Sequence, residues 1–282
     1  MASLIELLEK SPEFEKKDGI WFYTEDYKIS YPDEGNHVCF EIEDGSFWFN
    51  HRNDCIAALV DRFLEKDEVF CDIGGGNGVV SKHLQKSGQP CVLVEPGPNG
   101  AANAAKRGVE HVICSTLQVL PSQENFLDAA GAFDVVEHIE DDVAFVKKIH
   151  ESIKPGGHFI STVPAFQTLW SSEDVEAGHY RRYTMKTYTE LLEKCGFEVD
   201  YISYLFAPLI APIFLLRSLP YKLGRRKGAE EITDQAEGSH SSGGGIVENI
   251  LNSFWAGELN KVKNGQRIGV GSSVIAVGRK KG

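Results

Sequence analysis

The sequence lacks several features that define whole classes of protein. None of its six cysteines pairs at the two-residue spacing of a zinc knuckle or redox motif, so we expect reduced cysteines in the core. Lysine and arginine number only 29 against 41 aspartate and glutamate residues, which gives a net charge of −12. An acidic surface repels polyanions, so we expect no nucleic-acid partner.

Long apolar runs are also missing. Met1–Lys10 lacks the basic opening and the apolar stretch of a signal peptide, which predicts a cytoplasmic protein. The apolar stretch 205–216 is interrupted by two prolines and is shorter than the roughly 20 residues that span a bilayer. Two interpretations of residues 205–227, with their basic end, stay open: peripheral contact with a membrane or lipid-linked acceptor, or a buried hairpin or subunit contact. The sequence does not indicate an oligomeric state.

What the sequence does contain is an alternation of short apolar segments and helical patterns. The predicted strands of the alternation are 68–73, 90–95, 109–115, 126–134, 157–163 and 197–205. The predicted helices are 53–64, 78–86, 97–107, 141–153 and 184–195. Such an alternation predicts a parallel sheet with helices on both faces. A helix at 246–262 and a last strand at 272–278 complete a doubly wound, mostly parallel α/β fold of seven strands.

The chain divides into a core and its appendages. Residues 1–52, rich in aromatic side chains without periodicity, form an N-terminal preface that covers the core. Residues 53–205 form the core itself, in which Asn53 and Asp54 are the predicted caps of the first helix. Residues 206–269 form an apolar cap with a flexible Gly/Ser-rich insertion, and 270–282 return as the final strand.

The strongest functional signal is the loop Asp72-Ile73-Gly74-Gly75-Gly76-Asn77-Gly78, directly after the first core strand. Glycines let the backbone turn sharply and approach a ligand where any Cβ would collide. The dinucleotide fingerprint requires a glycine at its sixth position, but Val79 and Ser81 stand there, counted from Gly74 and Gly76. A carboxylate ahead of three alternating glycines instead fits a ligand with a cationic amino group.

The next strand ends in Glu95, 21 residues beyond Gly74 and close to the roughly 20 typical of a ribose-binding carboxylate. With the glycine loop, this acid resembles the first motifs of the class I S-adenosylmethionine-dependent methyltransferases. The segment 132–141 resembles the one after the fourth strand in the quinone-biosynthesis-like branch of that superfamily, and Lys154-Pro155-Gly156-Gly157 resembles its next motif. The resemblance covers about residues 53–205.

The resemblance implies a Rossmann-like methyltransferase fold, S-adenosyl-L-methionine as the cofactor, and O- or N-methylation of a small-molecule, saccharide or lipid-like acceptor. It implies that Thr116 and Leu117 flank the adenine, and that Phe133 and Asp134 lie beside the methionine part. The cofactor residues implied in all are Asp72, Gly74, Gly75, Gly76, Gly78, Glu95, Pro96, Thr116, Leu117, Phe133 and Asp134. Members of the quinone-biosynthesis-like branch usually have an acid at the third strand. This sequence has Cys114-Ser115-Thr116 there instead.

Upstream of the loop, the segment 47–53 resembles one that covers the cofactor in some bacterial relatives. Two interpretations stay open here. Arg52 holds the carboxylate of the cofactor, or the segment is a structural aromatic staple.

The acceptor side of the predicted site depends on histidines and on one aromatic loop. A hydroxyl acceptor is helped by a base of near-neutral pKa, and His138 and His179 are suited to that role, although His138 equally fits a packing role in its loop. The loop 178–183 is either an acceptor-facing lid or an ordinary polar loop. As a lid it supplies walls and an anionic contact through Trp170, Tyr180, Arg182 and Tyr183.

No metal is expected in this site. The methyl group of a sulfonium is already activated, so the protein has only to align the acceptor and exclude water. The histidines also lack a ligand spacing in the sequence. Two other functions remain as alternatives: a non-catalytic S-adenosylmethionine-binding or scaffold protein, and an NAD(P)-dependent oxidoreductase.

Overall fold

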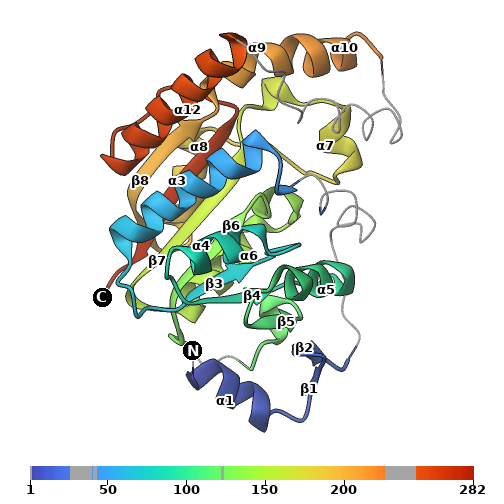
Figure 1. The fold of residues 1–282 in the computed structure, drawn as a ribbon, viewed down its shortest axis with the longest axis vertical. Coiled ribbons are helices and arrows are strands. Elements are labelled where there is room, and N and C mark those ends of the chain that lie inside the picture. The colour runs from blue at the N-terminus through green and yellow to red at the C-terminus, as the bar shows by residue number, and fades with distance from the viewer. Residues whose placement is uncertain (1, 26–39, 41–42, 122–123, 226–245) are drawn as a thin grey trace.

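The computed structural model describes residues 2–25, 40, 43–121, 124–225 and 246–282 (Figure 1). One sheet of nine strands runs through the middle, in the order β1-β2-β5-β4-β3-β6-β7-β9-β8. The strands are β1 Phe14–Lys17, β2 Ile20–Tyr23, β3 Phe70–Ile73, β4 Cys91–Val94, β5 Val112–Cys114, β6 Leu127–Phe133, β7 Ile153–Pro164, β8 Phe197–Leu205 and β9 Ser273–Lys280. Strands β2 to β7 pair in parallel, whereas β1 and β9 are antiparallel to their neighbours.

All seven predicted strands are present, and the doubly wound α/β fold is confirmed. The sheet is wider than the predicted seven strands because the N-terminal preface adds the hairpin β1–β2. Strand β2 continues the sheet beside β5, with Ile20 opposite Val112 and Trp21 opposite Ile113. Both β2 residues are buried. The aromatic-rich segment that contains both strands shows no sustained alternation, so the sequence pattern did not predict them.

Helices cover both faces of the sheet. They are α1 Ala2–Lys10, α3 Phe47–Phe63, α4 Val79–Lys86, α5 Pro98–Arg107, α6 Asp142–Ser152, α7 Ser172–Glu176, α8 Met185–Lys194, α9 Ile210–Ile213, α10 Leu219–Lys222 and α12 Ile246–Lys263. Successive residues of β4 face opposite sides: Val92 and Val94 pack in one core cluster with α1, α6 and α8, and Cys91 and Leu93 pack toward α3, α4 and α5. Helix α12 lies alongside α3 (Figure 1).

The first core helix begins earlier than predicted. Helix α3 starts after Ser46, whose hydroxyl accepts a hydrogen bond from the Trp48 amide at 3.2 Å. The prediction that Asn53 and Asp54 cap this helix is therefore wrong, and the helix crosses the expected boundary after residue 52. The reason is tertiary packing: Trp48 stacks on Phe206, a residue far away in the sequence.

Within the cap, a buried carboxylate on α12 joins that helix to the segment after β8 and to α3 of the core. Glu258 accepts hydrogen bonds from the backbone amides of Phe206 and Ala207, both at 2.9 Å, and lies 3.1 Å from His51 Nε2. The stretch 227–245, which we expected to be flexible, lies outside the described residues. Within the described ranges, no helix combines the length and apolar character that crossing a membrane requires. The five cysteines described are buried and free of disulfides.

Candidate functional site

The glycine loop joins β3 to α4 through a turn that only glycine can make. Gly74 and Gly78 have φ values of +69° and +77°, which L-residues with side chains rarely adopt. A Cβ at Gly74 would lie 2.8 Å from a methyl group of Val135, and one at Gly78 would lie 2.8 Å from Cβ of Ala104. The loop therefore needs glycine both for its backbone conformation and for its packing.

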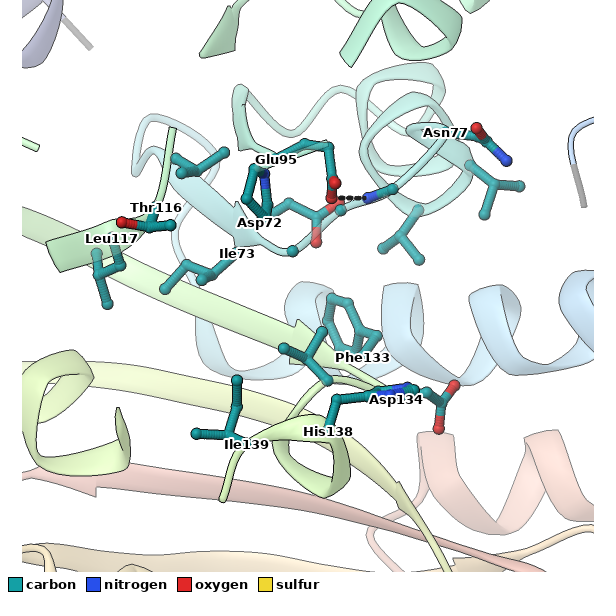
Figure 2. Close-up of a pocket in the computed structure, with 18 of the residues that line it drawn as sticks. Asp72, Ile73, Asn77, Glu95, Thr116, Leu117, Phe133, Asp134, His138 and Ile139 are labelled. Atoms are coloured by element: carbon teal, nitrogen blue, oxygen red, sulfur yellow. Dashed lines mark hydrogen bonds between the residues drawn. The ribbon is translucent and has the colours of Figure 1, made fainter. Parts of the chain in front are cut away.

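Two buried carboxylates flank this loop. Asp72, at 1% exposure, accepts a hydrogen bond from the Ser81 hydroxyl at 2.7 Å, and burial raises the pKa of Asp72 to about 6. Glu95 follows β4 and accepts from the Gly76 amide at 2.9 Å, drawn as a dashed line in Figure 2, and from the Gly97 amide at 2.7 Å. Glu95 thus fixes the loop against the neighbouring strand.

These groups line a cavity of about 670 Å³, within the range of small-molecule sites. In Figure 2, Asp72 and Glu95 lie on one side of the space and Phe133 and His138 on the other. Every residue predicted at the cofactor lines this cavity except Gly78, which acts through the backbone of the loop. Sequence reasoning assigned no site role to several other lining residues, among them Glu43, Val119, Phe145 and Ala177.

Arg52 lines the cavity, but its charge is engaged. Its guanidinium forms an ion pair with Asp134 and lies over the rings of Trp48 and Phe49, at 4.7 and 5.1 Å. Both interpretations of the segment therefore find support in the geometry, since the aromatic side chains pack around Arg52 and Arg52 faces the cavity. In the sequence, the aromatic residues before Arg52 indicated that this segment covers the site, whereas no pattern indicated Glu43.

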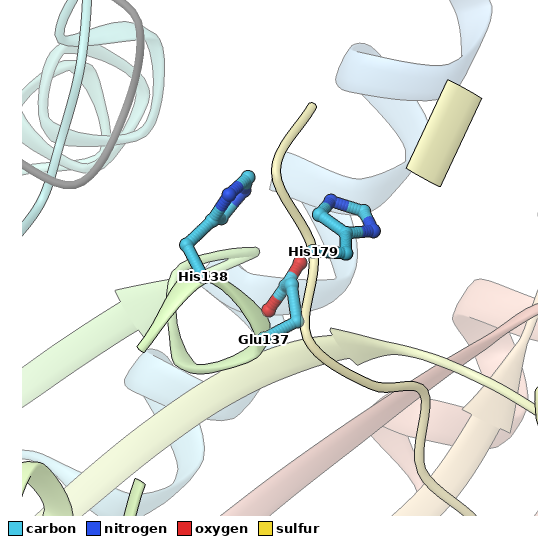
Figure 3. Close-up of side chains that lie close together, drawn as sticks. All are labelled: Glu137, His138 and His179. Carbon is cyan, nitrogen blue, oxygen red and sulfur yellow. The ribbon is translucent and has the colours of Figure 1, made fainter. Parts of the chain in front are cut away.

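Glu137, His138 and His179 come together beside the cavity (Figure 3). The rings of the two histidines have centroids 4.6 Å apart, and both residues line the cavity. Burial, reinforced by the neighbouring His179, lowers the pKa of His138 to about 4. Burial also raises the pKa of Glu137 well above its ordinary value. The expectation that the histidines do not cluster is wrong in three dimensions.

Asp174 orients His179. Its carboxylate accepts from His179 Nδ1 at 2.8 Å and from two nitrogens of Arg182, at 2.7 and 2.9 Å. Burial alone would raise the pKa of Asp174, but these hydrogen bonds outweigh it and hold the pKa below its ordinary value. No sequence motif singled out Asp174, which lies on the short helix α7.

The four residues predicted as walls for the acceptor are not among those that line the cavity. Arg182 is held by Asp174, and the buried Tyr183 donates its hydroxyl hydrogen bond to Asp142 at 2.8 Å. Tyr180 is 51% exposed, and Trp170 follows a short turn at 167–169. The loop 178–183 therefore contributes His179 to the cavity and uses Arg182 to hold the residue that orients it.

Comparison with known proteins agrees with this geometry. The fold and the glycine loop define a Rossmann-like protein with a nucleoside-sized site. A family model described as a methyltransferase domain matches residues 48–202, more than half of the chain. The chain belongs to this family, the S-adenosylmethionine-dependent methyltransferases.

Two curated relatives are similar over part of their length. A "Probable S-adenosylmethionine-dependent methyltransferase" of Mycolicibacterium smegmatis is 34% identical over 175 residues, which cover 60% of this chain and 66% of the relative. The ubiquinone biosynthesis O-methyltransferase of Parvibaculum lavamentivorans is 28% identical over 104 residues, or 35% and 41% of the two chains. The matches thus span less than two thirds of these relatives.

Solved structures share the fold at low identity. Haemonchus contortus phosphoethanolamine N-methyltransferase 2, bound to S-adenosylhomocysteine, superposes with a TM-score of 0.57 at 20% identity, covering 90% of this chain and 58% of that one. Geranyl diphosphate C-methyltransferase of Streptomyces coelicolor gives 0.51 at 13% identity, covering 80% and 78%. These likenesses confirm the Rossmann-like methyltransferase fold.

Proposed function

We propose that this chain transfers a methyl group from S-adenosylmethionine to an oxygen or nitrogen atom of a small-molecule, saccharide or lipid-like acceptor. One observation carries the proposal: the same cavity is lined by the glycine loop, by two buried carboxylates and by two imidazoles. The curated relatives named as O-methyltransferases support oxygen as the receiving atom.

The residues present fit the cofactor. The loop leaves space that a Cβ would fill, and the acid Asp72 faces the end where a cationic amino group gains most from it. A carboxylate accepts about four hydrogen bonds, and Glu95, which the Gly76 and Gly97 amides hold in place, lines the cavity where it would accept from ribose hydroxyls. When bound, the cofactor supplies a methyl group that is already activated for displacement by its sulfonium.

Other residues that line the cavity would contact the adenine and methionine parts of the cofactor. Thr116 and Leu117 would flank the adenine, and Phe133 with Asp134 would lie beside the methionine part. Ser115 supports this placement, because its buried hydroxyl has no hydrogen-bond partner within the part of the chain that is described. A buried hydroxyl without a partner is costly, and a polar ligand atom would remove that cost.

His138 and His179 would activate and align the acceptor. Both line the cavity, and Figure 2 shows His138 across the space from Asp72 and Glu95, where an acceptor atom would approach the transferred methyl in line. Asp174 fixes the orientation of the His179 ring, so little reorganisation is needed when the acceptor arrives. Through Asp174, Arg182 would act as a positioning residue.

The surface of the cap supports a lipid-like acceptor and peripheral contact with a membrane through residues 205–227. Leu215, Leu216 and Leu223 are 57%, 62% and 74% exposed. Lys222 and Arg225 are exposed beside them. Apolar side chains next to cations are the composition that membrane surfaces attract. Co-sedimentation with anionic vesicles tests this contact, and Leu215→Ser with Leu216→Ser should abolish it.

Titration calorimetry with S-adenosylmethionine tests the cofactor assignment. Glu95→Ala should lose binding while the circular dichroism spectrum stays native. Transfer of a labelled methyl group into fractions of a cell extract tests catalysis. Cofactor binding without transfer to any fraction would identify a non-catalytic binding protein, and tight binding of NADH instead would identify an oxidoreductase.

A further inference from the structure

Glu137 is buried without compensation. Its side chain has no exposed surface, and neither carboxylate oxygen has a hydrogen-bond partner within the described ranges. The backbone holds it in place, since the Tyr180 amide donates to the Glu137 carbonyl at 2.8 Å. Buried charges in proteins are paired, or they coordinate metals. The position of Glu137 therefore calls for a cation.

The two guanidinium groups nearby are already committed to other carboxylates. Arg52 pairs with Asp134, and Arg182 makes two hydrogen bonds to Asp174. Glu137 is thus the third carboxylate in a region where two arginines neutralise the other two. It is the carboxyl that no arginine neutralises, and a cation that displaced its proton would be attracted there.

Two imidazoles complete a set of donors around the same point. Ligand atoms of Glu137, His138 and His179 all lie within 4.8 Å of one another. Figure 3 shows the two rings on either side of the Glu137 carboxylate. Because a carboxylate can only accept, His179 Nδ1 carries the proton that it donates to Asp174, and Nε2 keeps the lone pair. A histidine held in this way by a carboxylate is the usual arrangement of a metal-binding imidazole.

We propose that Glu137, His138 and His179 bind one divalent transition-metal ion, with Zn²⁺ preferred over Mg²⁺. Two nitrogen donors and one carboxylate suit zinc, whereas magnesium prefers oxygen ligands throughout. Ligand atoms around tetrahedral zinc lie about 3.4 Å apart, so the side chains close in by about an ångström on binding. His138 and His179 line the cavity, which leaves a fourth position open toward it.

The open position gives the site a role in the proposed methyl transfer, and this step rests on the proposed function. An acceptor hydroxyl bound there would release its proton to solvent at a lower pH, because a bound cation lowers the pKa of a ligated hydroxyl. The oxygen would then form its bond to the methyl carbon as the bond from that carbon to the sulfonium breaks, which leaves S-adenosylhomocysteine. The Nε2 of His179 then serves as a ligand, and the cation activates the acceptor. Metal binding itself does not depend on that role.

Metal titration of the full chain, without an affinity tag and after removal of metals by a chelator, tests the proposal. Competition with a chromophoric chelator should give one Zn²⁺ per chain and at least 100-fold weaker binding of Mg²⁺. His179→Gln and Glu137→Gln should each weaken Zn²⁺ binding at least 100-fold, and Asp174→Asn should weaken it 10- to 100-fold. Co²⁺ should show the visible absorption of a tetrahedral site, which His179→Gln removes.

A matched control is His83→Gln, on α4, where the ring lies 3.3 Å from Asp54 and outside the cavity. It should leave zinc binding unchanged. Glu137→Gln alters a fully buried group and can fail to fold. If it does, His179→Gln, at a partly exposed residue, tests the proposal on its own. No zinc bound by the native chain, or zinc binding that survives His179→Gln, would overturn the proposal. Calorimetry with S-adenosylmethionine on the same samples separates this failure from failure of the proposed function.

Discussion

Asp72→Asn tests whether ionisation of Asp72, the acid ahead of the glycine loop, lowers the stability of the fold when no cofactor is bound. The side chain is 1% exposed, and its hydrogen bond from Ser81 only partly offsets burial, so the pKa of Asp72 is raised to about 6. In the unfolded chain the same group has a pKa near 3.9. The folded state therefore binds more protons than the unfolded state between about pH 4 and pH 6.

The sign and size of the effect follow from this difference. Below about pH 4 the group is protonated in both states, and above about pH 6 it is ionised in both. As the pH rises between them, the free energy of unfolding falls by about 3 kcal/mol, which is two pKa units at about 1.4 kcal/mol each. About 2 kcal/mol of that lies between pH 4.5 and pH 7.5. Asp72→Asn removes this loss, because the amide does not titrate and its oxygen can still accept from Ser81.

Urea denaturation without cofactor, repeated from pH 4.5 to pH 7.5, measures the effect. The difference in free energy of unfolding, variant minus native, should grow by about 2 kcal/mol toward pH 7.5. At pH 7.5 the variant should bind S-adenosylmethionine more weakly, because it lacks the charge that faces the cationic amino group. Stability and affinity should thus change in opposite directions.

Asp128→Asn is the control with the opposite sign. Burial alone would raise the pKa of Asp128, but its ion pair with Lys154 and the hydrogen bond from the Val69 amide outweigh this and lower it. Its carboxylate stabilises the fold above its ordinary pKa and loses that contribution as the pH falls. Parallel stability profiles for native protein and Asp72→Asn would refute the reasoning, since they would mean that Asp72 ionises at its ordinary pKa.

Three further substitutions test the scaffold around the site. Gly78→Ala forces a side chain onto a backbone with φ +77° and places its Cβ 2.8 Å from Ala104, so urea denaturation should show a loss of about 1–3 kcal/mol. Glu258→Gln leaves one oxygen for two backbone donors of the cap, and should cost about 1–3 kcal/mol in thermal unfolding. Tyr188→Phe removes a buried hydrogen bond to Ser161 and should cost about 1 kcal/mol without changing cofactor affinity.

The cofactor half of the site could be predicted because its signals are local. The loop after β3 and the acid after β4 are short segments at the same edge of a parallel sheet, and ligands bind at that edge. Their residue types and spacing therefore carry the geometry directly. Thr116 and Asp134 could be placed by the same reasoning, since each follows a strand end.

The acceptor half could not be predicted in the same way, because its contacts are not local. His138 and His179 are separated by α6, β7 and α7, and tertiary hydrogen bonds bring them together. Asp174, which orients His179, belongs to a helix of five residues, where it forms a capping box with Ser171. That pattern predicts the start of a helix but not a contact with His179. The early start of α3 was missed for the same reason, since its first turn packs on residues from the cap rather than on sequence neighbours.

The two halves are joined by one short segment, and this has a consequence for specificity. Asp134 at the end of β6 borders the cofactor end, and His138 borders the acceptor end only four residues later. Hydrogen bonds from Asp134 N to the Thr162 carbonyl, at 2.9 Å, and from His138 N to the Val135 carbonyl, at 3.0 Å, fix that segment. Under the proposed function, the sheet would therefore set the alignment for methyl transfer. The loop that carries His179 could then differ between acceptors without displacing the proposed cofactor end.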